Sequence, residues 1–354
     1  MVIGDVLREY RAIGRRGCMI IMGLALATLA VALVSVSASE VRIGVLEAFH
    51  ILYDHICGIE PATFKEILKD RIVCEQNIPR AIGAVLAGAT LAVCGAMLQN
   101  LIRNPLADPY TLGISSGAMF GMVLCVGLGI SVVPFIPTGD AQIVNAFVMA
   151  LIPTVVVILI SMFKKVTPTM MILCGIAVMY VFSAMTTLIK YSAESETLSM
   201  IYQWSIGSVS GLSWGAMPKM LAAFLVVVIP AYLLRSQIDL VAQGDNNAIT
   251  LGVDPNRLRM MCLVIVSVGT AIIVCYTGTI GFVGLVAPHM ARMMVGSKCR
   301  LLIPCSAAVG ALMLISADYA VRVIAPSLPV GVIIALVCSP IFIYILVRMR
   351  KNAW

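Results

Sequence analysis

Charge is scarce in this sequence. Of its 354 residues only 12% are charged, while 61% are hydrophobic, and the mean hydropathy is +1.04. A water-soluble domain could not cover its surface with so few charges. The composition therefore indicates an integral membrane protein.

Catalytic motifs are also scarce. The three histidines, His50, His55 and His289, form no HExxH pair, and the apolar runs hold no pair of carboxylates placed for acid-base chemistry. The chain has no Gly-Lys dipeptide, so it lacks the GxxxxGK[ST] loop that cradles ATP phosphates. We therefore expect no enzyme activity, no cofactor and no metal site in this chain.

Long apolar runs are abundant instead. A helix needs about 20 apolar residues to cross a ~30 Å hydrocarbon core. Stretches such as MLAAFLVVVIPAYLL are apolar on every face, unlike the alternating strands of a membrane barrel. The sequence predicts an all-α polytopic membrane protein, a single membrane domain over 1–354 with about ten spans, of which the eighth is short. The predicted spans are 18–37, 79–101, 111–133, 142–163, 169–189, 217–234, 258–277, 280–296, 302–324 and 329–348.

The placement of Lys and Arg orients these spans. With a cytoplasmic N-terminus, fifteen of the 24 basic residues fall on the cytoplasmic side and eight outside, while Arg292 lies near the eighth span. This bias follows the positive-inside rule, so we expect a multi-pass protein of the cell membrane with both termini cytoplasmic and no nucleic-acid partner. The cytoplasmic set is Arg8, Arg11, Arg15, Arg16, Arg103, Lys164, Lys165, Arg235, Arg257, Arg259, Lys298, Arg300, Arg348, Arg350 and Lys351, and the outer set is Arg42, Lys65, Lys69, Arg71, Arg80, Lys190, Lys219 and Arg322.

The first span also has the pattern of a secretory signal. Arg15 and Arg16 precede an apolar run that ends in the small residues SVSAS. A polytopic chain needs its first span to set orientation, so we predict that this run stays as the first helix.

Most of the eleven cysteines lie inside predicted spans, where they act as small apolar residues. Cys57 and Cys74 are exceptions, because both lie in the first extracytoplasmic segment, 38–78. A disulfide between them and two free thiols are both compatible with the sequence.

Three polar segments separate the spans. Within 38–78, IEPATFKEILKDRIV has helical spacing, and 190–216 predicts a short amphipathic or re-entrant helix on the same outer side. The third segment, 235–257, is cytoplasmic and reads as a helix DLVAQ, a break at Gly244, a helix NNAITLGV and a turn at Asp254-Pro255. Such an elbow suits contact with a cytoplasmic partner, although a solvated connector fits the same pattern.

The second span is followed by a break. Within RNPLADPYTLGISSGAMFG at 103–121, Pro105 and Pro109 stop the helix, and Asn104 can bond the backbone groups freed there. Broken backbone at membrane depth lines a cavity or is buried in protein, so the stretch indicates a gate, although a helix break with a structural role alone fits the same pattern. The span itself carries small residues at spacings that let helices approach closely, namely Gly83, Ala87, Gly88, Ala92 and Gly95.

One carboxylate, Asp318, lies inside a predicted span. Arg322 lies four residues on, on the same helix face, so a salt bridge or a docking group explains the pair simply. The alternative is an ion-coupled secondary transporter or channel that uses Asp318 and needs no ATPase. We expect an Asp318→Asn exchange to abolish ion-coupled uptake and to leave ATP-driven uptake largely intact.

Several long motifs resemble the FecCD-type permease subunits of ATP-binding-cassette importers for iron chelates, haem and cobalamin. Together they cover nearly the whole chain. The motifs are IPRAIGAVLAGATLAVCGAMLQNLIRNPLADPYTLGISSGA at 78–118, QWSIGSVSG at 203–211, GTIGFVGLVAPHMARMMVG at 278–296, GALMLISADYAVR at 310–322 and LPVGVIIALVCSPIF at 328–342.

The resemblance implies a type II importer permease that pairs with a second copy of itself. Two ATP-binding-cassette ATPase subunits would bind on the cytoplasmic side and an extracytoplasmic solute-binding protein on the other, with lipid around the spans. Transport would proceed by alternating access without chemistry in this chain. The family's coupling loop corresponds to the elbow, with Gly244, Asp245, Ala248, Leu251 and Gly252 as its residues.

The resemblance also implies docking and gate residues. Arg80 and Arg322 would meet glutamates of the binding protein and orient it. Asn77 stands where the family often has a further arginine, so docking would rest either on fewer charges or on Arg71 or Arg42. The residues that match the family's cytoplasmic gate are Asn104 and Leu106.

The chain departs from the family pattern at three places. Ser327 replaces a glutamate before LPVG, Cys338 replaces a glycine, and Lys298, Cys299 and Arg300 replace Asp-His-Arg. These departures indicate a divergent branch. A ferric siderophore, haem, a corrinoid and an oxyanion such as molybdate all stay open as cargo.

Overall fold

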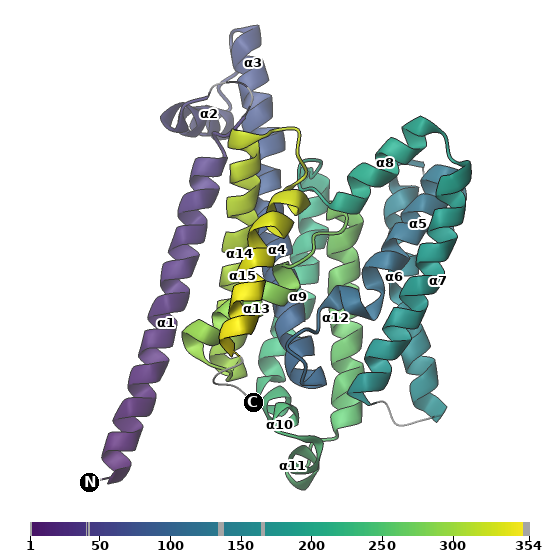
Figure 1. The fold of residues 1–354 in the computed structure, drawn as a ribbon. Coiled ribbons are helices and arrows are strands. Elements are labelled where there is room, and N and C mark those ends of the chain that lie inside the picture. The colour runs from purple at the N-terminus through teal and green to yellow at the C-terminus, as the bar shows by residue number, and fades with distance from the viewer. Residues whose placement is uncertain (1, 40, 42, 134–137, 164–166, 350–354) are drawn as a thin grey trace.

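The computed structural model describes residues 2–39, 41, 43–133, 138–163 and 167–349. Every regular element within these ranges is a helix (Figure 1). The all-α prediction is confirmed. Five of the predicted basic positions, Arg42, Lys164, Lys165, Arg350 and Lys351, lie outside the described residues.

Ten helices correspond to the ten predicted spans. Seven helical stretches of the described chain are long and apolar enough to cross a membrane, and α5, α13 and the apolar part of α15 are shorter. The 13 residues of α13 reach only about 20 Å, which confirms that the eighth span is short. The bounds are α1 (Val2–Ser35), α4 (Ile78–Ile102), α5 (Ile114–Leu128), α6 (Thr138–Phe163), α7 (Pro168–Ser192), α9 (Met217–Leu233), α12 (Pro255–Thr277), α13 (Val283–Val295), α14 (Cys299–Ile324) and α15 (Val330–Met349).

The other helices mark the two ends of the bundle (Figure 1). One end, called here the α2 end, carries α2 (Val45–Cys57), α3 (Phe64–Asp70), the π-helix η1 (Arg71–Asn77) and α8 (Ser195–Ile206). The opposite α11 end carries α10 (Arg235–Ala242) and α11 (Asp245–Thr250). Helix α1 begins and α15 ends at the α11 end. The helices predicted within 38–78, 190–216 and 235–257 are all present.

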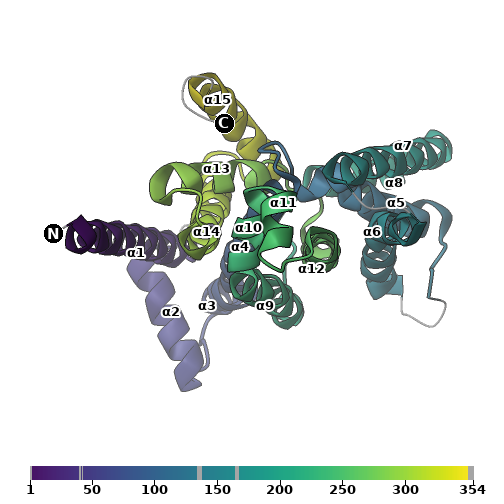
Figure 2. The ribbon, with the colours of Figure 1, turned by 90° about the horizontal axis from the view of Figure 1, so that it is seen from below.

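Helix α4 is the centre of the bundle (Figure 2). It contacts α9, α12, α13 and α14 and is buried over most of its length. A helix that is apolar all round is expected to be enclosed in this way. Helices α5, α6 and α7 form a second group that reaches the centre through α12, and α1 packs along α14 at the edge.

The crossing of α4 and α14 depends on two glycines. A Cβ atom added to Gly88 would overlap the carbonyl oxygen of Gly310, and one added to Gly310 would overlap that of Gly88. The two backbones are therefore in direct contact, which is how small residues pack membrane helices. The five small residues of α4 predicted to pack, Gly83, Ala87, Gly88, Ala92 and Gly95, are all buried.

A Gly88→Leu variant is expected to lose at least about 1–3 kcal/mol of folding stability, because a backbone carbonyl cannot move aside for the new side chain. Thermal unfolding in detergent measures the loss. Gly23→Leu is the matched control, since Gly23 is exposed on α1 and an added Cβ atom there meets nothing within 4 Å. Equal melting temperatures for the two variants would contradict the close crossing.

Candidate functional site

The elbow at the α11 end folds as its sequence predicts. Helix α10 stops at Ala242, Gly244 adopts a φ of 127° that favours glycine, and α11 starts at Asp245. Asp254 then caps α12, because its Oδ1 accepts hydrogen bonds from the backbone N–H groups of Asn256 (2.9 Å) and Arg257 (3.3 Å). The elbow thus consists of two short helices separated at Gly244, and a capped helix follows it.

The elbow presents an apolar face to its surroundings. Ile249 is 60% exposed and Leu251 is 64% exposed, although both lie in an otherwise polar loop. Ala248 is fully buried and packs α11 onto the bundle, so it supports this face and does not form it. Gly252 ends the elbow with a φ of 80°. An exposed apolar pair on a rigid loop suits contact with a partner protein.

A buried arginine ties the elbow to the centre of the bundle. Arg259 of α12 is 1% exposed and donates to both carboxylate oxygens of Asp245, at 2.9 and 2.6 Å. Its Nε also donates to the carbonyl oxygen of Leu101, at the end of α4 (3.1 Å). Arg103, one residue past α4, lies 3.3 Å from the same aspartate. The sequence did not predict this network. From the sequence, Arg259 was assigned only to the set of basic residues on the cytoplasmic side.

The Asp245 pair is insensitive to pH near neutrality. The hydrogen bonds from Arg259 hold the pKa of the Asp245 carboxyl below its ordinary value. A lowered pKa means that the pair stabilises the fold above about pH 4, and that this stabilisation is lost only as the pH falls through the lower folded value. The elbow is therefore tied to the bundle throughout the physiological range.

The predicted gate residues lie in the turn that follows α4. Arg103 ends the helix with a φ of 54°, and the Oδ1 atom of Asn104 accepts from the backbone N–H of Leu106 (2.9 Å). This hydrogen bond agrees with the expectation that the Asn104 side chain bonds a backbone group freed at the helix break. Leu106 is 47% exposed, so its side chain points away from this chain's own core.

The turn leads back into the bundle and meets a second break. Residues 104–108 connect α4 to the 3-10 helix η2 (Pro109–Leu112), and residues 278–282 separate α12 from α13. The N–H of Ile280 donates to the Tyr110 hydroxyl (3.2 Å), and Gly284 lies beside Pro109 and against Gly95 of α4. Since Gly95 precedes the end of α4 by seven residues, the two breaks meet about 10 Å inside the bundle. Pro109 and Ile280, at the point where the breaks meet, are both buried in protein, as membrane depth requires.

A charge cluster lies at the α2 end. Asp318 of α14 is fully buried, and its Oδ1 accepts from Nε of Arg80 (2.8 Å) and lies 2.7 Å from Nη2 of the same arginine. Its Oδ2 accepts from Nε of Arg322 (2.8 Å). Nη1 of Arg322 donates to the Ser35 carbonyl (3.0 Å) and to Oδ1 of Asn77 (3.1 Å). The cluster joins α1, α4 and α14.

The residues predicted to dock the binding protein differ in how accessible they are. Arg322 is 7% exposed and Asn77 5%, so both are enclosed in this chain and do not form an open mouth. The side chain of Arg80 is 16% exposed, and that of Arg71 is 71% exposed. Sequence reasoning recognised the Asp318–Arg322 pair but missed Arg80 as its third member, 238 residues away.

Arg80 borders a pocket of about 690 Å³ at the α2 end. The pocket lies between α8 and the two turns 208–210 and 326–329. Tyr202, Gln203 and the hydroxyl residues Ser195, Ser199, Ser208, Ser210 and Ser327 supply its polar lining. Ser327, where the family often has glutamate, thus makes this pocket neutral apart from Arg80.

Of the other departures, Cys299 and Cys338 are buried, whereas Lys298 and Arg300 are exposed. Cys338 of α15 is 4% exposed. Cys299 opens α14, where its N–H donates to Oδ1 of Asp239 in α10 (2.9 Å) and its Sγ accepts from Asn100 (3.1 Å). Cys57 and Cys74 are both free thiols in this structure.

One sequence pattern known from catalytic serines does not form a nucleophile elbow here. Gly113–Gly117, GISSG, does fit the Gly-x-Ser-x-Gly pattern, but a nucleophile elbow needs a strand before its helix, and the described residues contain no strand. Here Ser115, the serine at the nucleophile position of that pattern, lies in the first turn of α5, which follows the 3-10 helix η2. Asp318 is an equally poor ion carrier, because its two oxygens already accept from two arginines.

A helical bundle with an apolar surface, two breaks that meet inside it and a rigid elbow at one end defines a membrane transport protein. Comparisons with known proteins identify the family of transport proteins to which it belongs. The FecCD transport family matches residues 25–348, and the chain belongs to this family. Members of the family are permease subunits of ABC importers in the inner membrane and are not themselves enzymes.

Individual relatives can be aligned with this sequence over nearly the whole chain. The Fe(3+)-citrate import system permease protein of Bacillus subtilis (strain 168) is 34% identical over 333 residues, which cover 91% of this chain and 94% of that protein. The vitamin B12 import system permease protein of Vibrio cholerae is 34% identical over 319 residues, covering 89% and 95%. A solved structure of a metal-chelate type ABC transporter in an inward-facing conformation matches with a TM-score of 0.80 at 26% identity, covering 93% of this chain and 99% of that one. The type II ABC importer permease fold is thereby confirmed.

Proposed function

We propose that two copies of this chain form the membrane path of an importer for a large metal chelate. Two ATPase subunits bind at the α11 end, which faces the cytoplasm, and a solute-binding protein docks at the α2 end. ATP-driven closure of the ATPases pushes on the elbow, and the two copies rock to open and shut the path between them.

The elbow carries this proposal. Ile249 and Leu251 offer the ATPase an apolar contact, and Asp245 beside them is bonded to Arg259 and lies next to Arg103. Movement of α11 would thus reach the end of α4 and the turn that holds Asn104 and Leu106. If the second copy completes a gate at this turn, movement of the ATPases would be transmitted to the gate through α11 and the end of α4.

The positions of the charges support the orientation. Arginines gather at the α11 end, from the start of α1 to the elbow and the start of α14. The positive-inside rule assigns such an end to the cytoplasm, so both termini are cytoplasmic in this proposal. The arginines that make up this group include Arg8, Arg11, Arg15, Arg16, Arg103, Arg235, Arg257 and Arg300.

Docking of the binding protein falls to fewer residues than the family pattern implies. Arg71 and the rim residue Arg80 are accessible to carboxylates of a partner. Arg322 and Asn77 act behind them, because they hold Asp318, and Asp318 in turn fixes Arg80. Charges at a rim steer and orient a partner more than they raise its affinity.

The cargo is a ferric siderophore, haem or a corrinoid. Relatives named for iron citrate and for vitamin B12 support this class. Among the described residues, Arg80 is the one charged residue that lines the neighbouring pocket, and the other polar lining residues are mostly serines. Such a lining suits passage of a bulky chelate without tight binding. Selection would then belong to the solute-binding protein.

Purification from the native membrane in mild detergent tests the proposal. We expect one P-loop ATPase per permease in the purified complex, and its loss in an Ile249→Asp, Leu251→Asp double variant. Asn247→Ala is the control, since Asn247 is an exposed residue of the same short helix. A chain that emerges alone even after gentle cross-linking would contradict the ATP-driven mechanism.

A further inference from the structure

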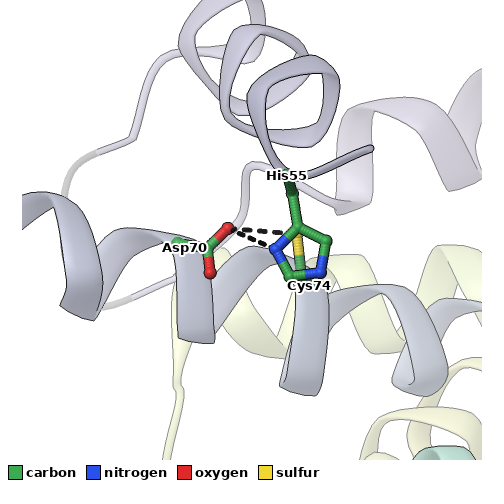
Figure 3. A group of neighbouring side chains, drawn as sticks. All are labelled: His55, Asp70 and Cys74. Atoms are coloured by element: carbon green, nitrogen blue, oxygen red, sulfur yellow. Dashed lines mark hydrogen bonds and ion pairs between the residues drawn. The ribbon is translucent and has the colours of Figure 1, made fainter. Parts of the chain in front are cut away.

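Three side chains with metal-binding atoms converge at the α2 end (Figure 3). His55 comes from the last turn of α2, Asp70 ends α3, and Cys74 lies in η1. The Nδ1 atom of His55 is 2.9 Å from Oδ1 of Asp70, and the thiol of Cys74 donates to the same oxygen at 3.6 Å. The three ligand atoms all lie within 4.8 Å of one another.

We propose that His55, Asp70 and Cys74 form a binding site for a divalent transition-metal ion, foremost Zn²⁺. A nitrogen, a carboxylate oxygen and a thiolate are the three kinds of ligand that zinc takes in proteins. Calcium and magnesium prefer sites made of oxygen atoms alone, so the imidazole and the thiol disfavour them. The proposal concerns metal binding by this chain and does not depend on the proposed transport function.

The spacing of the ligand atoms fits a zinc ion after a small adjustment. Zinc–ligand bonds of about 2.0–2.3 Å in a tetrahedron place neighbouring ligand atoms about 3.3–3.8 Å apart. The Cys74–Asp70 separation of 3.6 Å already meets this range. The His55–Asp70 separation of 2.9 Å must widen by about half an ångström. The His55–Cys74 separation, which is within 4.8 Å, must come into the same range, and rotation of the exposed imidazole can adjust both.

The site is held on one side and open on the other. Cys74 is 4% exposed and packs with Val73, Ile43 and Ala48 in a small apolar cluster, and its carbonyl accepts from the Trp214 indole (2.9 Å). The side chain of His55 is 51% exposed. A preorganised thiol with an accessible imidazole leaves the fourth position of the metal to water or to an outside ligand.

The backbone at the site is also unusual. Residues 71–77 form a π-helix that carries α3 into α4 without a break. Such segments are rare and are found frequently at functional sites. Here the π-helix presents Cys74 to α2. Helix α2 also contacts η1 through the apolar cluster, and it contacts the preceding helix α3 through the Glu47–Lys69 ion pair.

Metal binding changes the protons at the site in a defined way. The Cys74 thiol loses its proton to solvent and becomes the thiolate ligand. The neutral imidazole of His55 keeps its proton on Nε2, so that Nδ1 can bind the metal, and the Asp70 carboxylate supplies an oxygen. Since one proton is released, apparent affinity should rise with pH. The bound ion clamps α2 to η1.

Metal titration of the purified chain, reduced with a phosphine and carrying no polyhistidine tag, tests the site. We expect one Zn²⁺ per chain by competition with a chromogenic chelator, and a thiolate-to-metal charge-transfer band with Co²⁺. Cys74→Ser and His55→Gln should each weaken Zn²⁺ binding by roughly tenfold or more and should remove or diminish that band. Hydrogen exchange of residues 45–57 should slow on addition of Zn²⁺ to the parent chain and not to Cys74→Ser.

The neighbouring residues provide matched controls. Cys57 is an exposed thiol on α2, and His50 pairs with Asp54 at 2.8 Å on the same helix without a cysteine. Cys57→Ser and His50→Gln should bind Zn²⁺ like the parent chain. The site is refuted if no stoichiometric Zn²⁺ binds, or if Cys74→Ser binds as tightly as the parent. All four variants change exposed or isosteric groups, and size-exclusion profiles without metal verify that each is folded.

Discussion

An Asp318→Ala variant is expected to lose about 3–5 kcal/mol of folding stability, because removal of one partner leaves the remaining charges of a buried cluster uncompensated. Arg80 can turn toward the open pocket and keep part of its hydration. Arg322 cannot, since its side chain is 4% exposed and Nη1 is held by Ser35 and Asn77. The loss should appear as a lower melting temperature and a lower folded yield in detergent.

Two further variants test the electrostatic cause. Glu75→Ala removes a carboxylate from the Arg71–Glu75 pair, which has the same i,i+4 spacing but is more than half exposed, so little change is expected. Asp318→Asn combined with Arg322→Gln should recover part of the stability that Asp318→Asn alone loses, because it removes the uncompensated charge. Equal stability of Asp318→Ala and the parent chain would show that the cluster is not a buried ion network.

The same cluster corrects an experiment that the sequence suggested. Asp318→Asn looked able to separate ATP-driven from ion-coupled transport. Since Asp318 compensates both Arg80 and Arg322, this exchange would reduce the amount of folded protein and with it uptake under either mechanism. Membership of the FecCD family already excludes the ion-coupled alternative.

An Asp245→Asn variant is expected to uncouple ATP hydrolysis from uptake. Loss of the carboxylate charge loosens α11 from Arg259, and the movement of the elbow then no longer reaches α4. With the proposed ATPase present in proteoliposomes, uptake per ATP hydrolysed should fall about 5- to 150-fold, the range of ordinary coupling energies. Hydrolysis itself should persist, because Ile249 and Leu251 still contact the ATPase.

The controls separate coupling from binding. Arg259→Lys should give an intermediate loss, since a lysine cannot donate to both carboxylate oxygens in the same geometry. Asn247→Ala, on the same helix, should leave the uptake per ATP unchanged. A parallel fall of hydrolysis and uptake in Asp245→Asn would mean that Asp245 serves ATPase binding, and the mechanical link would be wrong.

Local patterns in the sequence determined the elements of this protein. Each span is a run of apolar residues, and the elbow is encoded by Gly244 and by Asp254-Pro255, all of which act on their immediate neighbours. The break after α4 is likewise encoded by Asn104 and the two prolines that follow it. Such signals lie within a few turns of a helix, so one sequence is enough to find them.

Only the tertiary structure decided which side chains meet. Arg80 and Asp318 are 238 residues apart, and Arg259 reaches the carbonyl of Leu101 across 158 residues. His55 gave no metal signature, because its partners Asp70, at the end of α3, and Cys74, in η1, lie 15 or more residues further along the chain. Nor could the sequence tell that Ala248 is buried while Leu251 is exposed. These outcomes depend on how helices pack against one another, and packing follows from the shape of the whole bundle rather than from any short stretch of it.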